Sequence, residues 1–165
     1  MVLQHARMAA DLCSALARQV EVSRLDSVIS PALGGILVGQ EIARILGKRH
    51  IFAEKDGGKL VLRRGFVIAP NERFLVAEDV VTQGGRVRET IEIVRAGGGK
   101  VSAVATLVDR STVPLDFGVP FHSLVKIQVE TFSPDQLPED LKAIPAVKPG
   151  SRSCDESNIS CNYSG

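Results

Sequence analysis

Apolar residues repeat along the chain with the spacing of amphipathic helices in three segments. Residues 8–20 and 36–46 carry apolar side chains near every third or fourth position, which predicts a helix in each. Gly47 follows the second of them and marks its end. A third amphipathic pattern runs from the glycine pair at residues 84–85 to about residue 96. These three helices account for much of the first hundred residues.

Short runs of β-branched and aliphatic residues lie before, between and after these helices. They predict strands over residues 26–30, 50–53, 60–62, 73–77, 101–108 and 124–129. Because strands alternate with helices, we predict an α/β fold whose mainly parallel sheet is flanked by helices on both faces. Folds of this kind bind ligands at the carboxyl ends of their strands, so the loops at that edge are the candidate site.

Length and charge limit the domain number and the class of partner. A chain of 165 residues that is 44% hydrophobic can bury one sizeable core, so we expect one domain over residues 1–152 and an appended or disordered tail over 153–165. The net charge of +1 supplies no general field for nucleic acid or membrane surfaces. No apolar run approaches the roughly 20 residues of a membrane helix, and no signal peptide is recognisable. We therefore expect a cytoplasmic protein without nucleic acid or membrane partners.

Cysteine and histidine spacing does not indicate a metal site held by the protein. The chain has three cysteines, of which Cys13 lies in a helical pattern and is expected to face the core. His5, His50 and His122 have no partner at metal or triad spacing, so structural or surface roles are expected for them.

Two carboxylates, a hydroxyl and two glycines follow the predicted strand at residues 73–77. A helix N-terminus preceded by small residues presents free N–H groups and a partial positive charge, both of which favour a phosphate. Gly84 and Gly85 allow close backbone approach, and Thr82 adds a hydroxyl donor. Glu78 and Asp79 can accept hydrogen bonds from vicinal ribose hydroxyls. Together these residues predict a site for ribose 5-phosphate.

A plain turn between strand and helix is the alternative interpretation. In that case Asp79 or Thr82 only caps the helix and the glycines only permit the turn. The acidic pair beside the glycines favours ligand binding over this alternative. Neither a G-x-G-x-x-G run after the first strand nor a P-loop pattern is present, which disfavours the two common nucleotide-binding classes.

Residues 76–85, VAEDVVTQGG, resemble the phosphoribosyl pyrophosphate signature of the type I phosphoribosyltransferases, and the orotate branch most closely. The resemblance implies their Rossmann-like fold and a Mg²⁺-dependent glycosyltransferase reaction, in which orotate and 5-phosphoribosyl pyrophosphate give orotidine 5′-monophosphate and pyrophosphate. The residues it implicates in substrate binding are Glu78, Asp79, Val80, Val81, Thr82, Gln83, Gly84, Gly85 and Arg86. Related sequences often carry serine where Arg86 stands. By the same resemblance Mg²⁺ is carried mainly by the substrate.

Residues 30–36, SPALGGI, resemble the family's pyrophosphate-binding loop, which implicates Leu33 and Gly34. Some relatives carry lysine at the position of Gly34. An ordinary strand-to-helix turn is the alternative for this segment. Residues 107–111, LVDRS, match the orotate branch, in which the arginine, here Arg110, binds the substrate carboxylate. A guanidinium pairs bidentately with a carboxylate, so Arg110 could select orotate over uncharged bases.

Residues 54–66, EKDGGKLVLRRGF, resemble the mobile catalytic loop that the orotate enzymes extend across a dimer interface. This resemblance makes Lys55 and Lys59 catalytic candidates together with Asp79, and it implies a homodimer. Lysine side chains there would offset the charge of the departing pyrophosphate.

The resemblance spans about residues 4–152. Family members normally begin several tens of residues earlier, with a segment that helps to cover the base, so we expect a short form, a fragment or a misassigned start. Two alternatives for the function stay open at this point. One is a non-catalytic regulator or partner subunit that binds phosphoribosyl pyrophosphate, and the other is a transferase for another base.

Overall fold

The computed structural model describes residues 2–128, 132, 136–142 and 144. The helices are η1 (Val2–Gln4), α1 (Ala6–Ala17), η2 (Val22–Arg24), α2 (Gly34–Leu46), α3 (Gly85–Ala96) and α4 (Glu139–Lys142). The strands are β1 (Ser27–Pro31), β2 (Arg49–Asp56), β3 (Lys59–Leu62), β4 (Arg73–Val81), β5 (Lys100–Asp109) and β6 (Phe121–Lys126). The chain divides into two compact units, Met1–Val129 and Glu130–Gly165. The expected tail at residues 153–165 lies outside the described part.

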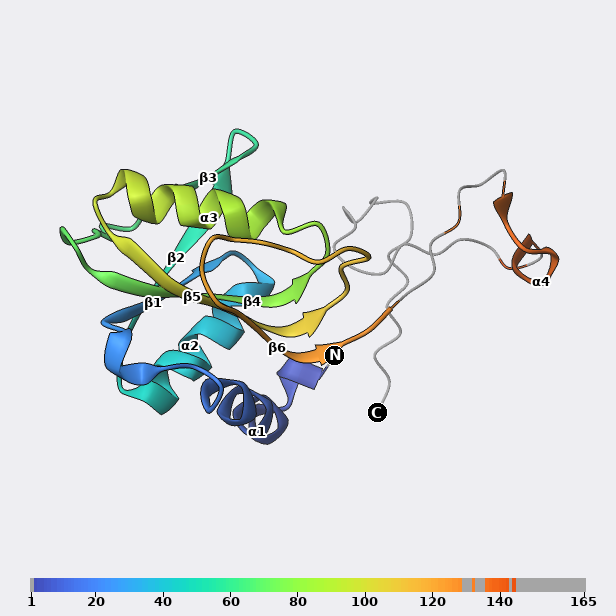
Figure 1. The fold of residues 1–165 in the computed structure, drawn as a ribbon, viewed down its shortest axis with the longest axis horizontal. Helices are drawn as coiled ribbons and strands as arrows, with labels where there is room; N and C mark the ends of the chain where they lie inside the picture. Colours follow the sequence, from blue (N-terminus) through green and yellow to red (C-terminus); the bar gives the residue numbers. More distant parts are fainter. Residues whose placement is uncertain (1, 129–131, 133–135, 143, 145–165) are drawn as a thin grey trace, which may run out of the picture. The chain divides into compact units, whose positions relative to one another are not determined.

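The strands of the first unit form one six-stranded sheet in the order β3-β2-β1-β4-β5-β6 (Figure 1). All neighbouring strands are parallel except β2 and β3, which pair antiparallel. β1 and β4 are adjacent although α2, β2 and β3 separate them in sequence, so the carboxyl ends of these two strands lie side by side. The predicted α/β fold with a mainly parallel sheet is confirmed.

Helices cover both faces of the sheet, with α1 and α2 on one face and α3 on the other (Figure 1). The sheet has a hydrophobic core on each face, and consecutive residues of β1 pack into different cores. Val28 packs with Cys13 and Val38 on the side of α1 and α2, whereas Ile29 packs with Val87 on the side of α3. This double coverage explains why all five residues of β1 are buried and why its sequence does not alternate with polar residues. The prediction that Cys13 faces the core is confirmed.

Three predicted boundaries were wrong in ways that matter for the site. β4 continues to Val81 because it pairs with β5 as far as the Val81–Asp109 partners, so the acidic pair lies inside the strand and not after it. Strands were predicted only at residues 50–53 and 60–62, but the segment between them is mostly part of a hairpin of β2 and β3, whose turn is the glycine pair at residues 57–58. The last strand lies at Phe121–Lys126, earlier than the predicted 124–129.

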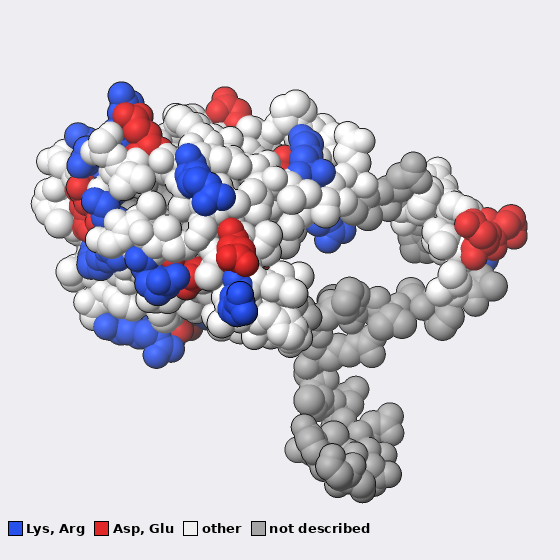
Figure 2. All heavy atoms as spheres, turned by 90° about the horizontal axis from the view of Figure 1, so that it is seen from below, with Lys and Arg blue, Asp and Glu red and all other residues white. Residues whose placement is uncertain are grey.

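Charged side chains of opposite sign lie next to one another on the surface seen in Figure 2. The structure contains an exposed ion pair between Arg73 and Asp26, with 2.8 Å between N and O atoms. Arg49 forms a further ion pair of 2.7 Å with Glu72, whose side chain is mostly covered. Such pairs leave little net field at a distance, so a binding site for an anion depends on local groups. Among the described helices, none has the length and apolar character needed to cross a membrane.

Candidate functional site

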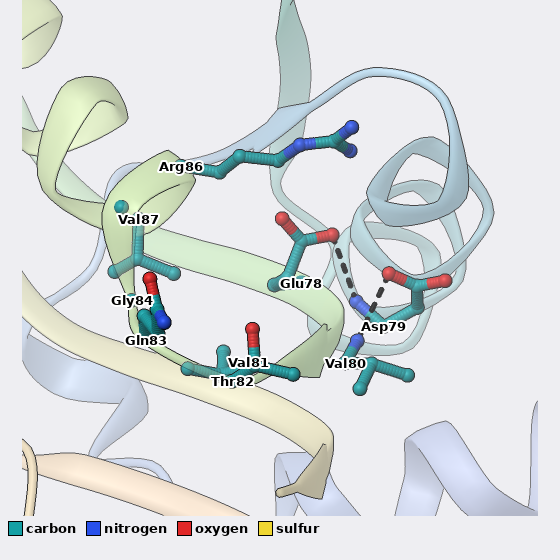
Figure 3. Close-up of a pocket in the computed structure, with 10 residues that line it drawn as sticks. Glu78, Asp79, Val80, Val81, Thr82, Gln83, Gly84, Arg86 and Val87 are labelled. Carbon is teal, nitrogen blue, oxygen red and sulfur yellow. Dashed lines mark hydrogen bonds between the residues drawn. The ribbon is translucent and has the colours of Figure 1, made fainter. Parts of the chain in front are cut away.

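A cavity of about 410 Å³ lies where β4 ends and α3 begins (Figure 3). Its lining residues are Glu78, Asp79, Val80, Val81, Thr82, Gln83, Gly84, Gly85, Arg86 and Val87. The first nine are the residues that the signature segment implicated, and the structure brings them together around one space. The cavity stands at the carboxyl edge of the sheet, where ligands of parallel α/β folds bind.

The carboxylates of the acidic pair occupy different environments. Glu78 is buried, with 2% of its surface exposed, whereas Asp79 is half-buried. The backbone N–H of Asp79 donates to Oε1 of Glu78 at 3.1 Å, and the N–H of Val80 donates to Oδ1 of Asp79 at 2.9 Å. These two bonds are the dashed lines in Figure 3. The neighbouring strand adds a contact, because the hydroxyl of Thr106 donates to the backbone oxygen of Asp79 at 3.2 Å.

Burial sets the protonation of Glu78. Burial, and after it the nearby carboxylate of Asp79, raise the pKa of this carboxyl from 4.5 to about 8, while Arg86 acts in the opposite direction. At neutral pH the free pair therefore carries a neutral Glu78. A proton on Glu78 allows it to donate a hydrogen bond as well as to accept one.

The turn between β4 and α3 depends on glycine. Gly84 has a φ of +76°, and a Cβ built on it would lie 2.9 Å from Cε1 of Phe117, so both the backbone and the packing exclude a side chain. Gly85 begins α3, and a Cβ there would meet nothing within 4 Å. The first N–H groups of α3 thus border open space in the cavity, which suits a phosphate.

The loop between β1 and α2 packs directly against the acidic pair. A Cβ built on Gly34 would lie 2.6 Å from Cγ of Asp79, and one built on Gly35 would lie 2.9 Å from Oε1 of Glu78. The Ala32–Leu33 peptide is cis, the N–H of Ala32 donates to the oxygen of Ala53 at 2.7 Å, and Leu33 is 78% exposed. The structure therefore places the two implicated loops next to each other, although Leu33 and Gly34 are not lining residues of the cavity.

The side chain of His50 contacts β1 just before this loop, and the sequence did not indicate this contact. Nε2 of His50 lies 2.6 Å from Oγ of the buried Ser30, and Nδ1 lies 3.3 Å from Oε1 of Gln40. A Cβ built on Gly39 would lie 2.6 Å from Oγ of Ser30, so α2 lies close to the hydrogen-bonded side chains of Ser30 and His50. Burial lowers the pKa of His50 to about 4, and the ring is neutral near pH 7. No spacing rule links Ser30 to His50; only the pairing of β1 with β2 brings them together.

Arg86 connects the two loops. Its side chain is exposed, and Nη1 donates to the backbone oxygen of Ala32 at 3.4 Å. In Figure 3 the guanidinium extends above Glu78 from the start of α3.

Arg110 directly follows β5 at the same edge of the sheet. Its N–H donates to the backbone oxygen of Val81 at 2.7 Å, and its side chain is exposed. The preceding Asp109 is buried and forms an ion pair of 3.3 Å with Lys126. The backbone of Arg110 is thus fixed beside the end of β4, while its guanidinium is outside the lining of the cavity.

Lys55 and Lys59 are not among the residues that line the cavity of the same chain. Both are exposed on the β2–β3 hairpin, and β1 separates β2 from β4 in the sheet. The N–H of Leu60 donates to Oε1 of Glu89 at 2.5 Å, which attaches the hairpin to α3. Within the described ranges, no group of three or more His, Cys, Asp and Glu side chains could hold a metal ion.

No protein-family model matches the chain. The orotate phosphoribosyltransferase of Caldanaerobacter subterraneus subsp. tengcongensis is 52% identical over 137 residues, which are 83% of this chain and 72% of that protein. The orotate phosphoribosyltransferase of Desulforamulus reducens is 48% identical over 151 residues, which are 92% and 79% of the two chains.

Solved structures share the fold. A crystal structure of adenine phosphoribosyltransferase from Thermoanaerobacter pseudethanolicus has a TM-score of 0.67 at 24% identity, over 76% of this chain and 84% of that one. The orotate phosphoribosyltransferase of Aeropyrum pernix has a TM-score of 0.60 at 25% identity, over 74% and 75%. The likeness to the adenine enzyme concerns the fold alone.

Proposed function

The chain belongs to the orotate phosphoribosyltransferase family, and on this premise we propose that it transfers the phosphoribosyl group of 5-phosphoribosyl pyrophosphate to orotate. The products are orotidine 5′-monophosphate and pyrophosphate, a step of pyrimidine biosynthesis. One observation supports this proposal most: the carboxylates at the end of β4 and the glycine turn before α3 line one cavity, and the β1–α2 loop packs against the same carboxylates. A ribose with phosphates on both sides of it needs the carboxylates, the glycine turn and the β1–α2 loop to lie close together.

The cavity divides naturally between the parts of the phosphoribosyl group. The turn of Thr82, Gln83, Gly84 and Gly85 offers backbone N–H groups, one hydroxyl and the positive end of α3 to the 5-phosphate. The carboxyl groups of Glu78 and Asp79 accept hydrogen bonds from the ribose hydroxyls. Since the backbone of Asp79 is held by Thr106, and its N–H by Glu78, these acceptors are positioned before the ligand arrives.

The reaction breaks the bond between the anomeric carbon and the pyrophosphate oxygen and forms a bond from that carbon to a ring nitrogen of orotate, which loses its proton to solvent. Positive charge develops on the ribose as the pyrophosphate departs. The carboxylate of Asp79 stabilises this charge electrostatically, which makes Asp79 the proposed catalytic residue in the cavity. The backbone N–H groups of Leu33 and Gly34, at the start of α2, donate hydrogen bonds to oxygens of the departing pyrophosphate.

Mg²⁺ is the proposed cofactor, and it would neutralise pyrophosphate charge when bound. The carboxylates of Glu78 and Asp79 are the nearby oxygen donors, and oxygen ligands suit this ion. Because only two carboxylates are available and one is protonated near neutral pH, most of the ligands would come from the substrate.

A second copy of the chain completes the proposed site. Lys55 and Lys59 lie exposed on a hairpin and do not line the cavity of their own chain, which is compatible with a role in the cavity of a neighbouring subunit. We therefore propose a homodimer in which each hairpin reaches the partner's cavity. Arg110 is the proposed contact to the carboxylate of orotate, and the cytoplasm is the proposed location.

A nucleobase panel tests the proposed function. The protein is incubated with Mg²⁺ and 5-phosphoribosyl pyrophosphate plus orotate, uracil, adenine or hypoxanthine, and consumption of each base is followed by ultraviolet absorbance. Consumption of orotate alone is the expected result. Consumption of a purine in place of orotate would reassign the base specificity. Binding of phosphoribosyl pyrophosphate without consumption of any base would favour the non-catalytic regulator.

A further inference from the structure

The β1–α2 loop has no side chain to bind the pyrophosphate at the position where some relatives have lysine. That position is Gly34, and a Cβ there would lie 2.6 Å from Cγ of Asp79. A side chain at this position would therefore require the carboxylate end of Asp79 to shift. The loop offers backbone donors only, so a charged group for the leaving pyrophosphate must come from another element.

Arg86 is the one lysine or arginine among the described residues that line the cavity. It stands in the first turn of α3, and its Nη1 reaches the oxygen of Ala32 in the β1–α2 loop at 3.4 Å. Figure 3 shows the side chain crossing above Glu78, while Thr82 and Gln83 lie on the other side of the cavity. The guanidinium thus projects away from the turn that suits the 5-phosphate and toward the loop that suits the pyrophosphate.

The environment of Arg86 leaves its charge available to a ligand. The side chain is exposed, and its one hydrogen bond among the described residues is a long one to a carbonyl, which leaves the other N–H groups of the guanidinium to bind oxygen anions. Guanidinium groups suit phosphates because they donate parallel hydrogen bonds to two oxygens.

We propose that Arg86 binds the pyrophosphate moiety of 5-phosphoribosyl pyrophosphate, where it supplies the cation that the loop around Gly34 lacks. This differs from the expectation that Arg86 joins Thr82 in binding the 5-phosphate. It rests on the proposed function, because it assumes that phosphoribosyl pyrophosphate is the ligand. On binding, the guanidinium exchanges the oxygen of Ala32 for oxygens of the pyrophosphate.

Binding of two ligands that differ only in the pyrophosphate tests the assignment. The affinities of 5-phosphoribosyl pyrophosphate and ribose 5-phosphate are measured by titration calorimetry with Mg²⁺, for the unmodified chain, Arg86→Ala, Arg86→Lys and the control Arg95→Ala. Arg95 is an exposed arginine in the last turn of α3. Arg86→Ala should weaken phosphoribosyl pyrophosphate binding roughly tenfold or more and leave ribose 5-phosphate within about twofold. Arg86→Lys should recover part of the loss, and Arg95→Ala should change neither affinity.

The outcomes separate this assignment from the proposed function. Equal losses for both ligands would place Arg86 on the 5-phosphate and overturn the assignment, with the proposed function intact. Unchanged affinity for phosphoribosyl pyrophosphate in Arg86→Ala would also overturn it. An unmodified chain that binds neither ligand would contradict the proposed function itself, and the assignment would fall with it.

Discussion

Gly34 stands so close to Asp79 that a Cβ on residue 34 would lie 2.6 Å from Cγ of the carboxylate. Gly34 begins α2 and Asp79 lies near the end of β4, and the pairing of β1 with β4 brings them together. A side chain at position 34 would require this carboxylate to shift, whether or not Gly34 contacts a ligand directly.

Gly34→Ala should reduce kcat/KM about tenfold to a hundredfold, because Asp79 must move and small displacements of a catalytic group cost this much. Steady-state kinetics with orotate checks the effect. Leu37→Ala, on the exposed side of the same helix, is the matched control and should keep full activity. Full activity of Gly34→Ala would show that Asp79 tolerates displacement.

Asp79→Asn should lower turnover roughly tenfold or more, since the amide keeps the shape of the side chain but removes the charge that stabilises the transition state. Asp11→Asn, an exposed change on α1, controls for the loss of one negative charge elsewhere. Unchanged kcat in Asp79→Asn would reject the catalytic assignment.

Glu78 should make the protein less stable as the pH rises. Its pKa is raised from 4.5 in the unfolded chain to about 8 in the folded one, so between these values the folded state binds more protons. The stabilisation is complete below about pH 4.5 and is lost as the pH approaches 8. Urea unfolding of Glu78→Gln should show a smaller loss over this interval, because glutamine cannot ionise. Parallel curves for both proteins would mean that Glu78 ionises normally.

His50 should make the protein less stable as the pH falls. Burial lowers its pKa from 6.5 to about 4, so stability from the neutral ring is present above pH 6.5 and is lost as the pH falls toward 4. His50→Ala should reduce the free energy of unfolding at pH 7 by about 1–3 kcal/mol, since Ser30 loses its buried partner. Replacement of the exposed His5 should leave the unfolding curve unchanged.

Arg110→Ala should weaken the use of orotate selectively. A charged hydrogen-bonded pair contributes about 1.5–3 kcal/mol, so KM for orotate should rise roughly tenfold or more while KM for phosphoribosyl pyrophosphate stays within about twofold. A proportional rise in both constants would indicate that Arg110 supports the site as a whole.

The α/β fold and most of the cavity could be predicted because their signals are local. The helix periodicity and the run from Glu78 to Arg86 are continuous in sequence, and one strand-to-helix connection keeps them together in space. The end of β4 was less predictable, since the pairing of Val81 with Asp109 extends the strand through two carboxylates that would ordinarily end it. Charged residues are tolerated there because that end of the strand faces the cavity.

Contacts between elements that are far apart in the sequence could not be predicted from spacing. The contact of Gly34 with Asp79 and the hydrogen bond of Ser30 with His50 depend on strand order, which puts β1 between β2 and β4. The direction of the Arg86 side chain depends in turn on the position of Ala32. The sequence predicted the elements that carry these residues, but not the distances between the residues.

Phosphorus NMR of the complete reaction tests the central claim most directly. The protein is mixed with 5-phosphoribosyl pyrophosphate, orotate and Mg²⁺, and the phosphate signals are followed with time, with orotate omitted in a parallel sample. We predict that orotidine 5′-monophosphate and pyrophosphate appear in equal amounts, and only when orotate is present. Phosphoribosyl pyrophosphate that persists unchanged in both samples would contradict the account.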